Sequence, residues 1–143
     1  MESTLQNPAL IAGRTSSKAT TIFFWIVTGI FCLEMTFTAY YELLVMPQAA
    51  EAFARLGFSA TAFRAELSLA KVVGVIVLLL PMIPARLKEW AYAGFAINLV
   101  SALIAHLSIH DRPQALIPSA TTSVLWCLSY YFWRRLQATQ TSA

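Results

Sequence analysis

Three ionisable side chains stand inside otherwise apolar stretches of this chain: Glu34, Lys71 and His106. A carboxyl, an amine and an imidazole are the groups that move protons in general acid–base catalysis. Placing a charge in a bilayer core costs about 3 kcal/mol or more, so such a group normally faces a partner or a wet cavity. We therefore treat these residues as the candidate catalytic groups.

Lys71 needs a counter-charge, and Glu34 is the best single partner. Both are expected at similar depth, near the middles of their apolar stretches. Glu66 is five positions from Lys71, so the two share a helix face poorly. An ion pair between Glu34 and Lys71 would either fix the register of two helices or form a functional site, and the sequence leaves both open.

Further polar residues lie near these groups along the predicted helices and are the candidate ligand-binding residues. An alternative role for Asn98 and its neighbouring serines is interhelical hydrogen bonding, worth about 0.6–2 kcal/mol per contact in membranes. The candidates are Tyr41, Glu42, Glu66, Asn98 and Asp111.

Metal and thiol chemistry have weak support. His106 and His110 are one helical turn apart, which can place two imidazoles on one face, but this spacing alone is a weak metal signature, and we predict no metal site. Cys32 and Cys127 are the only cysteines, without a C-x-x-C motif. They are interpreted as small apolar packing residues.

The elements that must position these residues are four apolar segments. The chain is 58% hydrophobic and 12% charged, whereas soluble domains are nearer 45–50% and 25%. A bilayer core about 30 Å thick needs about 20 apolar residues as helix. The sequence therefore predicts an all-α integral membrane protein, an antiparallel four-helix transmembrane bundle. Its predicted spans are residues 21–46, 63–84, 90–109 and 116–133.

The remaining segments are short. Residues 1–20 and 136–143 are polar and are predicted to be flexible tails around a transmembrane domain at 21–135. Residues 48–62 alternate apolar and polar side chains at helical spacing before Gly57. They predict a short interfacial helix between the first two spans.

Basic residues predict the orientation. The net charge is +3, and the basic residues flank helices rather than forming a nucleic-acid-binding stripe. One predicted side of the membrane carries Arg14, Lys18, Arg86, Lys88, Arg134 and Arg135, and the other carries Arg55, Arg64 and Arg112. The positive-inside rule then places both termini in the cytoplasm, in a multi-pass protein of the cell inner membrane.

Residues 25–134 resemble the DoxX-like family of small bacterial four-helix membrane proteins. The most specific matches are LKEWAYAGF at residues 87–95, A-K-x-x-G at residues 70–74, and the later His106. The family's relatives include a small subunit of a thiosulfate:quinone oxidoreductase, but most members have no assigned activity, so the resemblance implies architecture more firmly than chemistry. This chain differs in having Glu42 where a Lys is common and Glu34 where the family is usually apolar, which suggests a specialised polar interior.

Two classes of function stay open. The protein could bind a lipophilic small molecule, a quinone or similar, as an accessory subunit of a membrane redox system, either as a homo-oligomer or with a redox partner. Alternatively, Glu34, Lys71 and His106 could act as acid–base groups of a small membrane enzyme that isomerises or opens an epoxide or enone. The added acids Glu34 and Glu42 favour the enzyme, because an accessory subunit does not need them. The residues do not identify a cofactor, and no redox centre can be built from them alone.

Overall fold

The computed structural model consists of helices and short connections. It describes all residues except 1–7, 45, 56, 58–60, 111 and 142–143, and among the described residues there is no strand. The helices are α1 (Pro8–Leu44), α2 (Met46–Arg55), α3 (Thr61–Leu79), α4 (Ala85–Ser108) and α5 (Pro113–Thr141). The predicted all-α class is confirmed.

Proline and glycine mark most of the helix ends. α1 and α5 each begin at a proline, which is favoured at the first helical position because its missing N–H needs no partner there. Gly57 has a φ of 85°, a left-handed conformation that glycine adopts without strain, in the turn that follows α2. α3 stops just before Pro81, and α4 starts directly after Pro84.

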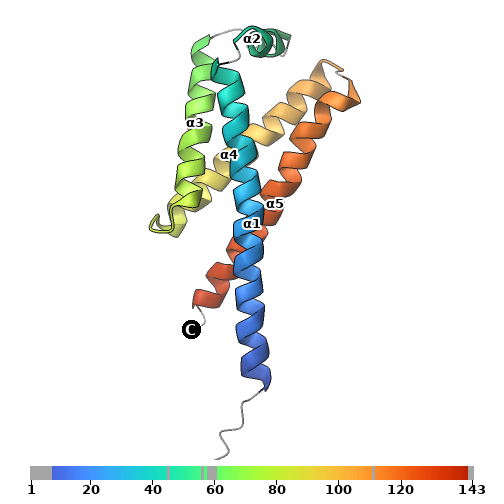
Figure 1. The fold of residues 1–143 in the computed structure, drawn as a ribbon. Helices are drawn as coiled ribbons and strands as arrows, with labels where there is room; N and C mark the ends of the chain where they lie inside the picture. Colours follow the sequence, from blue (N-terminus) through green and yellow to red (C-terminus); the bar gives the residue numbers. More distant parts are fainter. Residues whose placement is uncertain (1–7, 45, 56, 58–60, 111, 142–143) are drawn as a thin grey trace, which may run out of the picture.

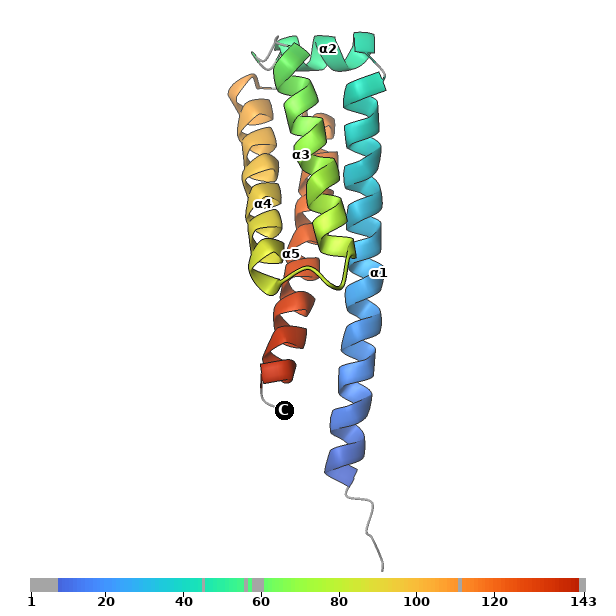
Figure 2. The same ribbon diagram turned by 90° about the vertical axis from the view of Figure 1, so that its left-hand side faces the viewer.

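The first helix is longer than predicted. α1 starts at Pro8, inside the segment for which a flexible tail is predicted, and continues to Leu44. The short helix expected after the first span is present as α2, with Pro47 in its first turn. Figures 1 and 2 show α2 lying across one end of the long helices, and this end is called the α2 end below. The start of α1 and the end of α5 lie toward the opposite end, called the terminal end.

Each of the four long helices packs against two of the others, so that the contacts form a closed ring. α1 packs against α3 and α5, and α4 packs against the same two helices. Across the middle, the rings of Phe31 on α1 and Phe95 on α4 meet edge to face, with centroids 5.1 Å apart. Gly74 of α3 lies against this contact, since a Cβ built on it would be 2.7 Å from Phe95 Cζ. An aromatic centre thus joins three helices.

The outer surface is strongly apolar. Large exposed hydrophobic residues lie on every long helix, including Leu33 on α1, Val73 on α3, Ile97 on α4 and Val124 on α5. In the described part of the chain, two helical segments are long and apolar enough to cross a membrane, Lys18–Leu44 and Ala85–Ser108. The helix α3 is continuous, but its apolar sequence is interrupted by Arg64, Glu66 and Lys71.

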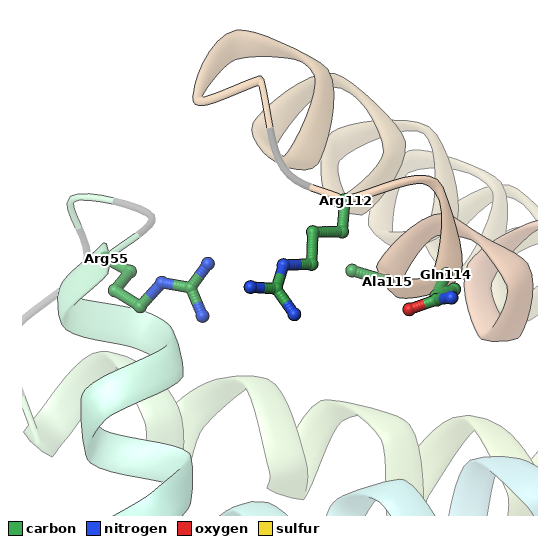
Figure 3. Close-up of a pocket in the computed structure, with 4 residues that line it drawn as sticks. All are labelled: Arg55, Arg112, Gln114 and Ala115. Carbon is green, nitrogen blue, oxygen red and sulfur yellow. The ribbon is translucent and has the colours of Figure 1, made fainter.

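A hollow opens at the α2 end. Its volume is about 600 Å³, and Arg55, Arg112, Gln114 and Ala115 line it (Figure 3). It lies between the last turn of α2 and the start of α5.

Candidate functional site

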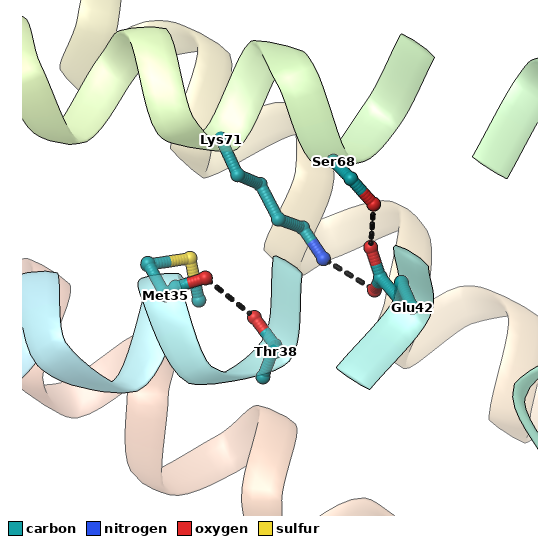
Figure 4. A network of polar contacts seen from close by, with 5 residues as sticks. All are labelled: Met35, Thr38, Glu42, Ser68 and Lys71. Atoms are coloured by element: carbon teal, nitrogen blue, oxygen red, sulfur yellow. Dashed lines mark hydrogen bonds and ion pairs between the residues drawn. The ribbon is translucent and has the colours of Figure 1, made fainter. Parts of the chain in front are cut away.

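The main charged cluster joins α1 to α3. Glu42 is in the last turn of α1, and Lys71 is midway along α3. The Lys71 ammonium donates to Glu42 Oε1 at 2.5 Å, and the Ser68 hydroxyl donates to Glu42 Oε2 at 3.0 Å. Ser68 and Lys71 share a helix face because they are three residues apart. Figure 4 shows both side chains directed from α3 toward Glu42.

Burial gives this pair its energetic weight. The Lys71 side chain is 7% exposed and that of Glu42 is 13% exposed. Water therefore screens the two charges weakly, and removing either one would leave the other as an uncompensated buried charge. The three groups form a prearranged set of a proton donor, a carboxylate and a hydroxyl, which can hold a polar group of a ligand or move a proton.

Glu34 does not pair with Lys71, so that prediction was wrong. Its Oε1 accepts a hydrogen bond from the Thr122 hydroxyl of α5 at 2.6 Å. The same hydroxyl lies 2.8 Å from the carbonyl oxygen of Pro118, so it is shared between two acceptors. Glu34 and Glu42 are eight residues apart, which rotates their directions by about 80° on a helix. One acid therefore reaches α5 and the other reaches α3.

The remaining candidate residues are dispersed. His106 and Asn98 are half-buried on α4, whereas Glu66 and Tyr41 are exposed, and Asp111 lies outside the described residues. Their role as site residues therefore remains a prediction.

Metal and cysteine chemistry have no assembled centre in the described part of the chain. His106 is within α4, but His110 lies beyond its end with a φ of 50°, so the two imidazoles do not share a helix face. No group of three or more potential metal-binding side chains occurs among the described residues. Cys32 is buried and Cys127 is exposed, and both are free thiols.

A second polar cluster, made of neutral groups, lies nearer the terminal end. The Ser129 hydroxyl of α5 is 2.7 Å from Thr28 Oγ1 of α1 and 2.7 Å from the Tyr92 hydroxyl of α4. Thr28, Tyr92 and Ser129 are almost fully buried. The indole N–H of Trp126 donates to the Tyr92 carbonyl at 3.0 Å. This hydroxyl network ties three helices together without placing a charge among them.

The segment at residues 87–95, which carries the most specific sequence match, makes contacts between helices. Lys88 donates to the Leu78 carbonyl near the end of α3 at 3.3 Å. Glu89 accepts from Arg134 of α5 at 2.8 Å. Tyr92 supplies the hydroxyl network, and Phe95 packs on Gly74. These contacts account for the segment as an assembly motif, with no catalytic role required.

Several contributing residues were missed by the sequence reasoning. Ser68 had a usable signal, since it stands three residues before Lys71 and faces the same way. Thr28, Thr122 and Ser129 had none, because a hydroxyl in an apolar helix can also bond to its own backbone. Their partners follow only from which helices are neighbours.

The sequence model of the DoxX-like family matches residues 26–128, which include the charged pair and most of the hydroxyl network. Searches of curated proteins and of solved structures found no match. The family match and the two long apolar helices together indicate a membrane protein.

Proposed function

Since this chain belongs to the DoxX-like family, we propose that it is a four-span membrane protein that binds a lipophilic small molecule at the Glu42–Lys71–Ser68 cluster. The observation that carries the proposal is the buried ion pair between α1 and α3. An intramembrane ion pair is costly, and such residues usually mark a ligand or proton pathway.

The proposed membrane arrangement is an antiparallel four-helix bundle with both termini in the cytoplasm of an inner-membrane protein. Two observations support it. Each long helix exposes large apolar side chains, as a lipid-facing helix does. The basic residues Arg86 and Lys88 lie in the first turn of α4, and Arg134 and Arg135 lie in the last turns of α5, both toward the terminal end (Figure 2).

The chemistry of the cluster favours a ligand with a carbonyl or hydroxyl oxygen. The Lys71 ammonium has three donors and the Ser68 hydroxyl has one, so both can turn toward an acceptor oxygen. Glu42 accepts hydrogen bonds and can hold a ligand hydroxyl. A quinone has carbonyl oxygens on an apolar ring, and its reduced form has hydroxyls, so both forms suit these groups. The protein would then serve as an accessory subunit of a membrane redox system.

A second candidate is a membrane-embedded enzyme. The direct contact between the Lys71 ammonium and the Glu42 carboxylate favours it, because such a contact allows a proton to pass between the two groups during isomerisation or opening of an enone or epoxide. The acid–base pair in this version is Glu42 and Lys71. Glu34 and His106 would then be secondary groups.

The test is quinone binding by the purified full-length protein in detergent. A decyl-substituted benzoquinone is titrated and intrinsic tryptophan fluorescence is recorded. The double variant Glu42→Gln/Lys71→Met removes both charges together and should therefore fold, while its affinity falls about tenfold or more, as expected when hydrogen bonds to a charged group are lost. Glu51→Gln, which changes an exposed acid of α2, should bind as the unmodified chain does.

The outcomes separate the two candidates. If the double variant loses quinone binding and Glu51→Gln keeps it, the result supports the quinone-binding function. Conversion of an enone or epoxide substrate by the unmodified chain in vesicles, lost in the double variant, supports the enzyme. If a folded double variant retains both properties, the pair is only structural and the proposal fails.

A further inference from the structure

We propose that Glu34 and Thr122 form a binding site for a small monovalent cation, a proton or a sodium ion, inside the bundle. Glu34 is half-buried in the apolar stretch of α1, and Thr122 is 3% exposed on α5. The proposal rests on α1 crossing the membrane, and it does not depend on quinone binding at the Glu42–Lys71–Ser68 cluster. It gives Glu34 a role of its own, separate from the charged pair.

Glu34 is an acid at membrane depth without a counter-charge. It lies within Lys18–Leu44, the segment of α1 that is long and apolar enough to cross a membrane. In the described part of the chain, its carboxylate accepts a hydrogen bond from the neutral Thr122 hydroxyl, and no ion pair to Glu34 occurs there. An unpaired carboxylate in such a setting is costly, and a bound cation neutralises it.

The charged groups on the helices packed against α1 do not supply that cation. On α3, Lys71 is engaged by Glu42, and Arg64 and Glu66 lie nearer the α2 end. On α5, the first titratable side chain after Thr122 is Cys127, five residues further toward the terminal end. The positive charge that balances Glu34 therefore has to come from outside the protein.

The oxygen atoms around Glu34 have one proton fewer than their contacts call for. The Thr122 hydroxyl lies 2.6 Å from Glu34 Oε1 and 2.8 Å from the Pro118 carbonyl oxygen, and a hydroxyl has one proton to donate. A proton on Glu34 completes the set, because the acid then donates to Thr122 and Thr122 donates to Pro118. A sodium ion can take the place of that proton, since oxygen atoms of side chains and backbone are the ligands of hard cations. The shared chemistry is a small cation held by oxygen atoms, and the experiment separates the two.

Pro118 also supplies a route to Glu34 from the hollow at the α2 end. Proline has no N–H, so the carbonyl of Gln114, one turn earlier in α5, lacks its usual helical donor. Gln114 lines the hollow (Figure 3), and Gln114, Pro118 and Thr122 follow one another at four-residue steps. Backbone and hydroxyl oxygens therefore lead from the hollow toward the carboxyl of Glu34, as interrupted helices do at cation sites inside membranes.

The test uses the full-length protein in lipid vesicles and the lipophilic probe dicyclohexylcarbodiimide. The probe adds to a protonated carboxyl and leaves an N-acylurea with the combined mass of the two reactants, which mass spectrometry counts at each acid. Labelling is run in choline chloride and in sodium chloride at equal ionic strength. Glu51, exposed on α2, is the comparison acid within the same chain. Thr122→Val removes the hydroxyl at nearly constant shape, and Thr122→Ser keeps it.

In choline chloride we expect Glu34 to be labelled about tenfold or more above Glu51, because an exposed acid is ionised at neutral pH. Protection of Glu34 by sodium chloride identifies the sodium ion as the cation, and equal labelling in the two salts identifies the proton. Labelling should fall about fivefold in Thr122→Val, as expected when a hydrogen bond to the acid is lost, and should be kept in Thr122→Ser.

The proposal is overturned if Glu34 of the folded, unmodified protein is labelled no more than Glu51. It is also overturned if a folded Thr122→Val protein is labelled as the unmodified chain is, since the hydroxyl would then have no part in the site. Quinone binding does not enter either readout, so this proposal and the one for the Glu42–Lys71–Ser68 cluster can fail separately.

Discussion

The two polar clusters of this protein solve the same problem in different ways. The cluster near the α2 end uses full charges, Glu42 and Lys71, and leaves the carboxylate 13% exposed. The cluster nearer the terminal end uses only the hydroxyls of Thr28, Tyr92 and Ser129, which are almost fully buried. Both join helices across an apolar interior. They differ in how much free energy of folding is lost when one member is left without its partner.

That difference separates assembly from function. Neutral hydroxyls can hold helices together at low desolvation cost. A buried charge pair contributes little net stability, yet losing one member leaves the other uncompensated. A protein that needed only to hold α1 against α3 could use hydroxyls there too. The retained charges therefore support the charged cluster as the functional one and the hydroxyl network as the structural one.

The largest expected effect is on Glu42→Gln. This change leaves the Lys71 ammonium buried without a counter-charge, and we expect the free energy of unfolding to fall by about 3–5 kcal/mol. Reversible unfolding in mixed micelles measures it. The double variant Glu42→Gln/Lys71→Met should recover most of the loss. If the single variant were as stable as the unmodified chain, the pair would not be the costly element described above.

The next effect concerns the aromatic centre between the two clusters. Gly74→Ala places a methyl group 2.7 Å from Phe95 Cζ, and Phe95 cannot move easily because it is buried and packed on Phe31. We expect a loss of about 1–3 kcal/mol from overpacking. Gly94→Ala is the matched control, since nothing lies within 4 Å of its added methyl. Equal stability of the two variants would show that Phe95 is free to shift.

A smaller effect is expected for Ser129→Ala in the hydroxyl network. The change removes the shared partner of Thr28 and Tyr92, which should cost about 1–2 kcal/mol. Thermal unfolding measures the loss, and quinone affinity should stay unchanged within about twofold because no charge is altered. Loss of quinone binding in a stable Ser129→Ala protein would show that the hydroxyl network takes part in binding and is not only structural.

The smallest effect should come from the exposed pair at the terminal end. Arg134 and Glu89 are 2.8 Å apart, with side chains 57% and 43% exposed. Glu89→Gln should lower stability by at most about 1 kcal/mol, and less at high salt, because water screens such a pair. A salt titration of the unfolding midpoint tests this. A loss of stability that is independent of salt and well above about 1 kcal/mol would show that this pair behaves like a buried ion pair.

The sequence predicts those features of the fold that depend on a single helix, namely where it lies in the chain and where it ends. Apolar segments, Pro81 and Pro84 after α3, and Gly57 after α2 mark the helices and their connections. The early start of α1 was missed because residues 1–20 were interpreted by their polar content. Pro8 followed by alanine and leucine is a strong helix start.

The candidate site follows less completely, because depth along a helix does not give direction around it. Lys71 was predicted to be buried and paired, and it is. The partner of Lys71 was misassigned to Glu34 because the two were expected at similar depth. The residue on the side of α1 that faces Lys71 is Glu42. The Arg55–Arg112 hollow had no sequence signal at all, since it depends on where α2 lies over the start of α5.

The length of α1 has a mechanical consequence. Its 37 residues span about 55 Å at 1.5 Å per residue, while a bilayer core is about 30 Å thick. A continuous helix of this size forms a rigid stalk that would project from the membrane by several turns. Its other end is held against α3 by the contact between Glu42 and Lys71. The turns of α1 nearest Pro8, which extend past the ends of α3 and α4 (Figure 2), would then lie outside the bilayer core.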